Sequence, residues 1–185
     1  MKVYTIIGGP HSCGKSSLLG ILRSEVNNIG RVINEYDNTE SSNDNINTNE
    51  YLYQSAEKCI ESGICFTQEI TLLNPQILAT IKKASEYGYY IRLYYVGLNT
   101  VEESLLRIQN SKLKSGCDIS RRNIENSFAR RYDLVAILPY CNEAIFFDNE
   151  NGFVGIAEYK NKKWSQLAET LPEWMISFLE YIKEK

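Results

Sequence analysis

The segment Gly-Pro-His-Ser-Cys-Gly-Lys-Ser at residues 9–16 constrains this chain more than any other feature. It directly follows a short apolar run, Val3 to Ile7, which predicts a buried β-strand. Glycines let backbone N–H groups turn inward, and a helix starting at Lys15 would direct the positive end of its dipole at the same point. Strand, glycine-rich turn and helix together predict a loop that binds the phosphates of a nucleotide.

Each residue type in this loop has its own task. In such a pattern Lys15 reaches the β- and γ-phosphates, and the Ser16 hydroxyl binds Mg²⁺. A glycine-rich turn that binds nothing is the alternative, but the preceding strand, the spacing, the lysine and the serine all argue against it. We therefore expect ATP and Mg²⁺ as cofactors, held by Gly9, Pro10, His11, Ser12, Cys13, Gly14, Lys15, Ser16 and Ser17.

Length and composition predict an ordinary single domain over residues 1–185. The net charge is -3 and the basic residues are spread along the chain, which argues against a nucleic-acid partner. Five cysteines without a C-x-x-C pair, and one histidine, leave no zinc set and fit reduced thiols in the cytoplasm. The apolar start is too short for a membrane span, so we expect a cytoplasmic protein without a membrane segment.

Apolar runs alternate with amphipathic stretches, which predicts an α/β fold with a mainly parallel five-stranded sheet flanked by helices, as in P-loop NTPases. The expected strands are Val3–Ile7, Arg31–Asn34, Ile64–Glu69, Tyr90–Val96 and Ala144–Asp148. The expected helices are Lys15–Val26, Tyr51–Ser62, Pro75–Tyr87, Thr100–Asn110, Ser120–Ala136 and a last one within Leu171–Lys185 that packs on the core through Trp174, Phe178 and Ile182.

Two polar segments lie where ligands bind in such folds. Ser111–Asp118, with Gly116 inside it, could be a loop that closes over a nucleotide, which suggests a helical lid at about 107–131, or it could be a plain turn between helices. Asn38–Asn49 could be a surface loop beside the active edge or a solvated linker.

Carboxylates follow the predicted strands at the edge where the phosphate loop lies. Glu35 and Asp37 come after the second strand, and Glu69 ends the third. Either of the first two could accept the proton of a substrate hydroxyl. Glu69 lies on an apolar strand, where a carboxylate is costly to bury without a metal shell, a lysine or a substrate hydroxyl.

Cations that could stabilise a transferring phosphate come from the later half of the chain, although most arginines on a helix are simply solvated. They are Arg107, Lys112, Lys114, Arg121, Arg122, Arg130 and Arg131.

Together these motifs resemble zeta toxin-like P-loop kinases, also described as UDP-N-acetylglucosamine kinases. The resemblance rests on Gly8–Pro10 with Gly14–Ser17, Phe66–Leu72, Tyr87–Tyr89, Val96–Leu98, the helix with Glu102, Glu103, Arg107 and Ile108, and Phe147–Asn149. It implies a nucleotide-kinase-like fold, ATP and Mg²⁺, and transfer of phosphate to a hydroxyl of a nucleotide sugar. It also implies phosphate contact by Arg107, substrate contact by Asn34, Glu69 and Thr71, and an antitoxin-like protein as a partner.

The chain departs from the family pattern at two places. Asn34-Glu35-Tyr36-Asp37 carries its aspartate one position later than the family's N-x-D motif, so Asp37 is the favoured base and Glu35 the second candidate. In the lid, Ser115-Gly116-Cys117 stands where the family has paired glycines and a histidine, Ser111 holds the place of an arginine, and Ile124–Ser127 replaces an arginine run.

These departures keep alternatives open: a non-catalytic ATP-binding module, and a nucleotide or nucleoside kinase. A GTPase is disfavoured because Asn161-Lys162-Lys163-Trp164 lacks the aspartate of an N-K-x-D motif.

Overall fold

The computed structural model describes residues 1–34, 48–115 and 119–184, without the side chains of 48, 49 and 111–115. The predictions made for residues 35–47 and 116–118 lie outside this part. The first half contains β1 (Val3–Gly8), α1 (Lys15–Glu25), β2 (Arg31–Ile33), α2 (Thr48–Ser62), β3 (Phe66–Ile70), α3 (Pro75–Glu86) and β4 (Tyr90–Gly97). The second contains α4 (Val101–Ser115), α5 (Arg121–Ala129), the 3₁₀ helix η2 (Arg131–Tyr140), β5 (Glu143–Asp148), β6 (Val154–Lys160), β7 (Lys163–Gln166) and α6 (Glu173–Lys183).

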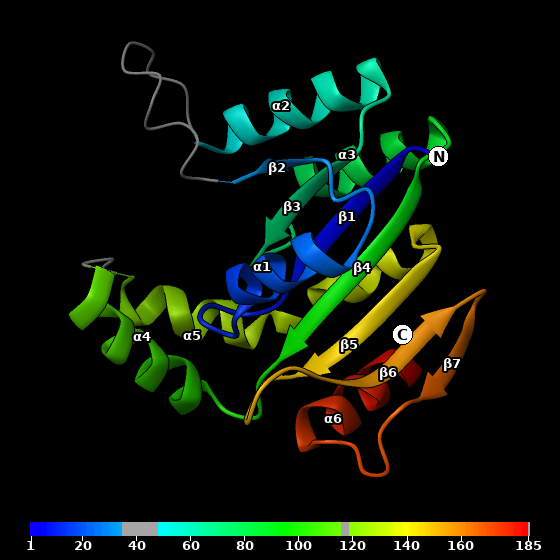
Figure 1. Ribbon diagram of the computed structural model, residues 1–185. Coiled ribbons are helices and arrows are strands. Elements are labelled where there is room, and N and C mark those ends of the chain that lie inside the picture. The colour runs from blue at the N-terminus through cyan, green and yellow to red at the C-terminus, as the bar shows by residue number, and fades with distance from the viewer. Residues whose placement is uncertain (35–47, 116–118, 185) are drawn as a thin grey trace.

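The strands form one sheet in the order β2-β3-β1-β4-β5-β6-β7. The five predicted strands are all present and pair in parallel, which confirms the mainly parallel α/β fold. In Figure 1 these strands point toward the side of the molecule on which α4 and α5 lie. The phosphate loop leaves β1 at this edge, since it follows the carboxyl end of that strand.

The sheet is larger than the predicted five strands, because β6 and β7 extend it as an antiparallel hairpin. The turn between them is Asn161-Lys162, and both residues have positive φ, +52° and +61°. A two-residue hairpin turn with both residues in this conformation matches the twist of the flanking strands. The Asn161-Lys162 pair, which lacks the aspartate of a guanine-binding motif after it, thus forms a hairpin turn.

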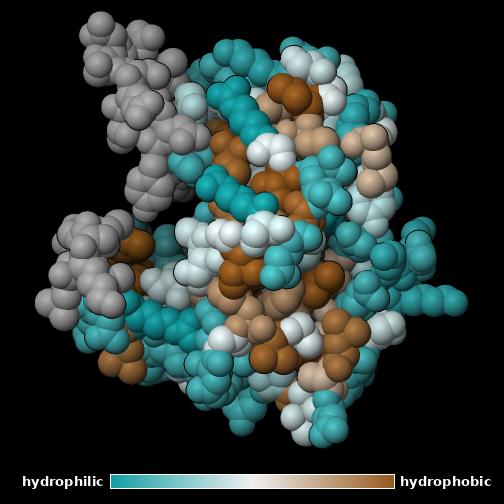
Figure 2. Space-filling model, in the orientation of Figure 1, coloured by the Kyte–Doolittle hydropathy of each residue, from teal (hydrophilic) through white to brown (hydrophobic). Residues whose placement is uncertain are grey.

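Helices cover both faces of the sheet, as Figure 1 shows with α1 in front of the strands and α3 behind them. On one face α1 packs through Leu18, Leu19 and Leu22. On the other face α2, α3, η2 and α6 share one apolar cluster with the strands. Because α1 covers only part of its face, hydrophobic side chains remain visible below it in Figure 2, over the part of the sheet where β4 to β6 lie.

The predicted core role of the last helix is confirmed. Trp174 and Phe178 of α6 are buried against the sheet, where their rings approach that of Tyr95. Gly97 lies directly under Trp174, and a Cβ there would be 2.2 Å from the indole ring. The strand can end beneath α6 only because this residue has no side chain.

Two boundaries differ from the predictions around the expected lid. Residues 111–115 continue α4 and are helical, not a loop. The helix expected over Ser120–Ala136 ends at Ala129, and the chain goes on as the 3₁₀ helix η2, which contains Pro139. Within the described ranges, no helix has the length and apolar character needed to cross a membrane.

Candidate functional site

The backbone of the loop between β1 and α1 requires glycine at two positions. Gly9 has φ +147° and Gly14 has φ +108°, values that other residues rarely adopt. A Cβ on Gly9 would lie 2.3 Å from the carbonyl oxygen of Val96, and one on Gly14 would lie 2.5 Å from Nδ2 of Asn149. The backbone conformation therefore favours glycine at both positions, and at Gly9 the Val96 backbone also leaves no space for a side chain.

Lys15 is the first residue of α1, and its side chain folds back over the loop. Its Nζ donates to the carbonyl oxygens of Gly9 at 3.0 Å and Pro10 at 2.9 Å, and the residue is only 9% exposed. The ammonium charge is thus held inside the turn beside the N-terminus of α1, where the backbone also favours an anion.

Ser16 and Glu69 meet across the start of α1. The Ser16 hydroxyl donates to Oε2 of Glu69 at 2.9 Å. Glu69 reaches it from β3, where it is paired in register with Ile7 of β1 and is half-buried. The Glu69 carboxylate, which was expected to need a partner on its apolar strand, therefore lies at the phosphate loop and accepts a hydrogen bond from the Ser16 hydroxyl.

Arg107 braces the loop from α4. Its guanidinium donates to the carbonyl oxygens of Cys13 at 3.4 Å and Asn149 at 2.6 Å. Asn149 in turn donates from Nδ2 to the same Cys13 oxygen at 2.9 Å. Arg107 also opposes the raised pKa of Glu103, which comes mainly from burial of that carboxyl. Asn149, after β5, and Arg107 of α4 therefore both bind the loop at the Cys13 carbonyl.

His11 is held between two helices through its backbone. The Ser104 hydroxyl of α4 donates to the His11 carbonyl at 2.5 Å, and the His11 N–H donates to Oγ of Ser127 in α5 at 3.2 Å. Burial, and to a lesser degree the charge of Lys15, lower the pKa of the imidazole from 6.5 to about 4. The ring is consequently neutral near pH 7 and adds no charge to the loop.

A cavity of about 1150 Å³ opens over the loop and runs between α1, α2 and α3. Ten of the predicted site residues line it: His11, Ser12, Gly14, Lys15, Ser16, Ser17, Asn34, Glu69, Thr71 and Arg107. Gly9, Pro10 and Cys13 are not among the lining residues, and the Cys13 thiol is buried in the apolar cluster under α1. These three residues can face a ligand only through their backbone.

Several of the remaining predicted residues cannot be placed at the site. Glu35 and Asp37, the two candidate bases, lie outside the described residues, and so do the side chains of Lys112 and Lys114. Three of the arginines expected around a lid make local contacts instead: Arg121 pairs with Glu125 and Arg130 with Asp133, while Arg131 stacks on Phe128 and Tyr132. None of these three lines the cavity.

Sequence reasoning did not select several residues that shape the site. Ser104 lies three positions before Arg107, hence on the same helical face, which was a usable signal. Gln68 and Asn149 lie within segments that carry the resemblance, but the contacts of Ser127, Asn149 and Gln68 could not be foreseen, because their partners are 116, 136 and 64 residues away in the chain.

The residues at the loop fit a magnesium ion bound together with phosphate. Among the residues that the structure describes, no group of three or more His, Cys, Asp or Glu side chains could hold a metal by itself. Mg²⁺, however, is commonly bound by one or two protein oxygens together with substrate phosphates and water. The Ser16 hydroxyl and the Glu69 carboxylate offer hard oxygen ligands of this kind.

No known protein family matches the sequence. An uncharacterized protein of Haemophilus influenzae is 42% identical over 57 residues, which are 31% of this chain and 40% of that protein. The chain thus spans well under half of this relative.

Solved structures match over almost the whole chain. A structure of the AvrRxo1-ORF1:-ORF2 complex with ATP has a TM-score of 0.62 and 13% identity, covering 98% of this chain and 71% of that one. A structure of the PezAT chromosomal toxin-antitoxin system of Streptococcus pneumoniae has a TM-score of 0.62 and 13% identity, covering 100% of this chain and 85% of that one. In the AvrRxo1 complex with sulphate ions the share of that chain is 61%. At these identities the likeness concerns the fold, which is the one that the resemblance implied.

Proposed function

We propose that this chain is an ATP- and Mg²⁺-dependent kinase that transfers the γ-phosphate to a hydroxyl of a small molecule. The observation that carries the proposal is the meeting of Lys15, Ser16 and Glu69 at one end of a single large cavity. Its volume of about 1150 Å³ exceeds the range of about 300 to 1000 Å³ usual for one ligand, so donor and acceptor both fit.

Each of these side chains has a role in that reaction. When ATP binds, Lys15 gives up its hydrogen bonds to the loop carbonyls and contacts the β- and γ-phosphates. The N-terminus of α1 faces the same negative charge. Ser16 and Glu69 would hold Mg²⁺, which when bound neutralises charge on the phosphates. Arg107 keeps the loop in place and lends positive charge beside it.

The base that accepts the proton of the acceptor hydroxyl is proposed to be Asp37, with Glu35 second. Both follow β2, whose end borders the cavity through Ile33 and Asn34. A lid at about residues 107–131 and an antitoxin-like protein partner are parts of the same proposal. The partner is supported only by the fold shared with a chain from a toxin-antitoxin system. Reduced cysteines support a location in the cytoplasm.

The test is to incubate purified protein and MgATP with nucleotide sugars, sugars, nucleosides and nucleotides, and to look for a mass gain of one phosphate. UDP-N-acetylglucosamine belongs in the panel because the resemblance implies it. Lys15→Ala should abolish the gain, whereas Lys163→Ala, at an exposed lysine of β7, should not. Asp37→Asn should remove turnover and keep ATP affinity, with Asp44→Asn of the same segment as matched control. Unchanged turnover in both Asp37→Asn and Glu35→Gln would refute the assignment of the base.

A second candidate is a non-catalytic module that binds ATP and changes its contacts with a partner. It is favoured by the local contacts of Arg121, Arg130 and Arg131, which leave few cations for a transferring phosphate. ATP binding that needs Lys15, without transfer to any acceptor in the panel, would decide for this module.

A further inference from the structure

The cavity has a strongly uneven charge distribution. Among the described lining residues the cations are Lys15, Arg23 and Arg107, and the single carboxylate is Glu69. Lys15, Arg107 and Glu69 gather at the phosphate loop, while Arg23 lies on an exposed turn of α1. The opposite half of the cavity, called the acceptor half here, is formed by the ends of β2 and β3 and by α2 and α3. Its described walls carry no charge: Ile33, Asn34, Leu52, Tyr53, Gln68, Ile70, Thr71, Asn74, Gln76, Ile77 and Thr80.

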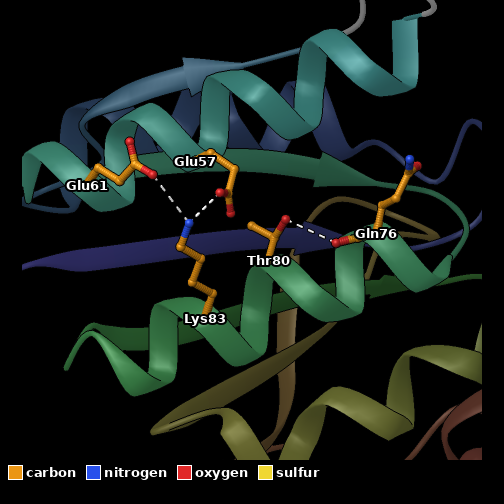
Figure 3. Close-up of polar contacts among 5 residues, drawn as sticks. All are labelled: Glu57, Glu61, Gln76, Thr80 and Lys83. Carbon is orange, nitrogen blue, oxygen red and sulfur yellow. Dashed lines mark hydrogen bonds and ion pairs between the residues drawn. The ribbon is translucent and has the colours of Figure 1, made fainter.

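A basic residue one helical turn beyond this wall on α3 is already engaged. Lys83 follows Thr80 by one helical turn, and Figure 3 shows its ammonium directed at two carboxylates of α2. It forms ion pairs with Glu57 and, at 3.5 Å, with Glu61. Thr80 donates to the carbonyl oxygen of Gln76, as Figure 3 also shows.

Gln68 is the most buried polar side chain of the acceptor half apart from Thr80, with 6% exposure. The buried Tyr4 hydroxyl donates to its Oε1. This bond fixes the amide with Nε2 as its remaining group. Nε2 makes no hydrogen bond within the described residues, and it is not one of the fully buried side-chain atoms that lack a partner. It is therefore accessible, and it faces the cavity that Gln68 lines. Gln68 thus presents an N–H donor to whatever occupies this space.

We propose that the acceptor is an uncharged molecule with several hydroxyl or carbonyl oxygens, such as a free sugar or a nucleoside, and that Gln68 donates a hydrogen bond to one of these oxygens. The proposal rests on the kinase function proposed above and gives its acceptor class. A diphosphate in the acceptor half would lose its water next to the triphosphate and to Glu69, and among the described lining residues the one cation away from the phosphate loop is the exposed Arg23. Neutral oxygens find their partners in the amides and hydroxyls of the wall.

The experiment measures acceptor binding by calorimetry in the presence of Mg²⁺ and a non-hydrolysable ATP analogue. Matched pairs are N-acetylglucosamine with UDP-N-acetylglucosamine, and uridine with UMP and UDP. We expect at least one neutral member to bind more tightly than its phosphorylated counterpart, with an affinity that changes little with salt. Gln68→Leu should weaken that binding about 10- to 100-fold, because a buried donor is lost. Gln54→Leu, on the exposed side of α2, should not change it.

Tighter binding of the phosphorylated member in every pair, or no binding of any neutral member, would overturn the proposal, as would unchanged affinity in a folded Gln68→Leu protein. The analogue's own affinity, measured in each variant, shows whether the loop is intact. Binding of a neutral acceptor without transfer of phosphate from MgATP would leave this inference standing and refute the kinase function. Transfer of phosphate to a nucleotide sugar alone would support the kinase function and refute this inference.

Discussion

His11 offers a direct test of the electrostatics of the loop. It is the only histidine of the chain, so the proton on Cε1 of its imidazole gives one signal that can be followed without overlap from other histidines in an NMR titration. Burial and the charge of Lys15 lower its pKa from 6.5 to about 4. We expect that titration to show a neutral ring at every pH above about 5.

The same shift predicts how stability depends on pH. Between pH 6.5 and pH 4 the unfolded chain binds a proton at His11 that the folded chain does not, so the folded state loses stability as pH falls through this window. Because the ring is only half-buried, solvent reduces the effect to about 1 to 2 kcal/mol. Urea unfolding of the wild type and of His11→Gln at pH 7 and pH 4.5 measures it: the wild type should lose more stability than the variant on acidification.

Lys15→Ala should raise the pKa of His11 part of the way toward 6.5, because the lysine charge is the smaller of the two causes. Lys163→Ala serves as the control for loss of a distant lysine. Saturation with MgATP should also raise the pKa, since phosphate favours the charged imidazole. A pKa near 6.5 in the free protein would refute the burial of His11, and no change in Lys15→Ala would refute the proximity of the two side chains.

Three further predictions follow from individual contacts. Gly97→Ala should destabilise the protein by about 1 to 3 kcal/mol or prevent folding, because its Cβ would be 2.2 Å from the Trp174 ring; urea denaturation measures this, and the added Trp174→Leu change should restore part of the loss. Arg107→Lys should weaken ATP binding about 10-fold in calorimetry, since an ammonium cannot span the carbonyls of Cys13 and Asn149; equal affinity would show that the bridge is dispensable. The Cys13 thiol, buried and with its pKa raised by burial, should react with a thiol reagent far more slowly than the partly exposed Cys65, as followed by peptide mass mapping; comparable rates would mean that the loop opens readily.

The part of the fold that could be predicted from the sequence is the part determined by residues close together in the chain. The apolar run before the loop, the glycines within it and the lysine and serine after it all lie within residues 3–16, and the structure has β1, the turn and α1 in those places. Glu69 could be singled out because a carboxylate on an apolar strand requires a partner, and that partner is the Ser16 hydroxyl. Thr100 accepts a hydrogen bond from the Glu103 N–H, as the capping pattern indicated.

The β6–β7 hairpin was missed for a physical reason. An edge hairpin buries little: most of β7 is exposed, and only Ile156 and Ala157 of β6 are buried. Its main signal is the turn, where Asn161 and Lys162 both adopt positive φ. Asparagine is common in such turns but lysine is not, so the pair lacks the glycine that would have identified it.

The contacts that tie α4 and α5 to the loop could not be predicted from sequence, because they join distant segments. Ser104 and Arg107 hold the loop from one face of α4, and Ser127 holds it from α5. All three bind backbone atoms of residues 11–13, so these turns of the two helices cannot move without breaking hydrogen bonds to the phosphate loop itself. In the proposed kinase, a lid that closes over a nucleotide while the loop stays formed would leave these turns of α4 and α5 in place. Its closure would then be coupled to phosphate binding through the Arg107 guanidinium and through two serine hydroxyls that have no recognisable motif of their own.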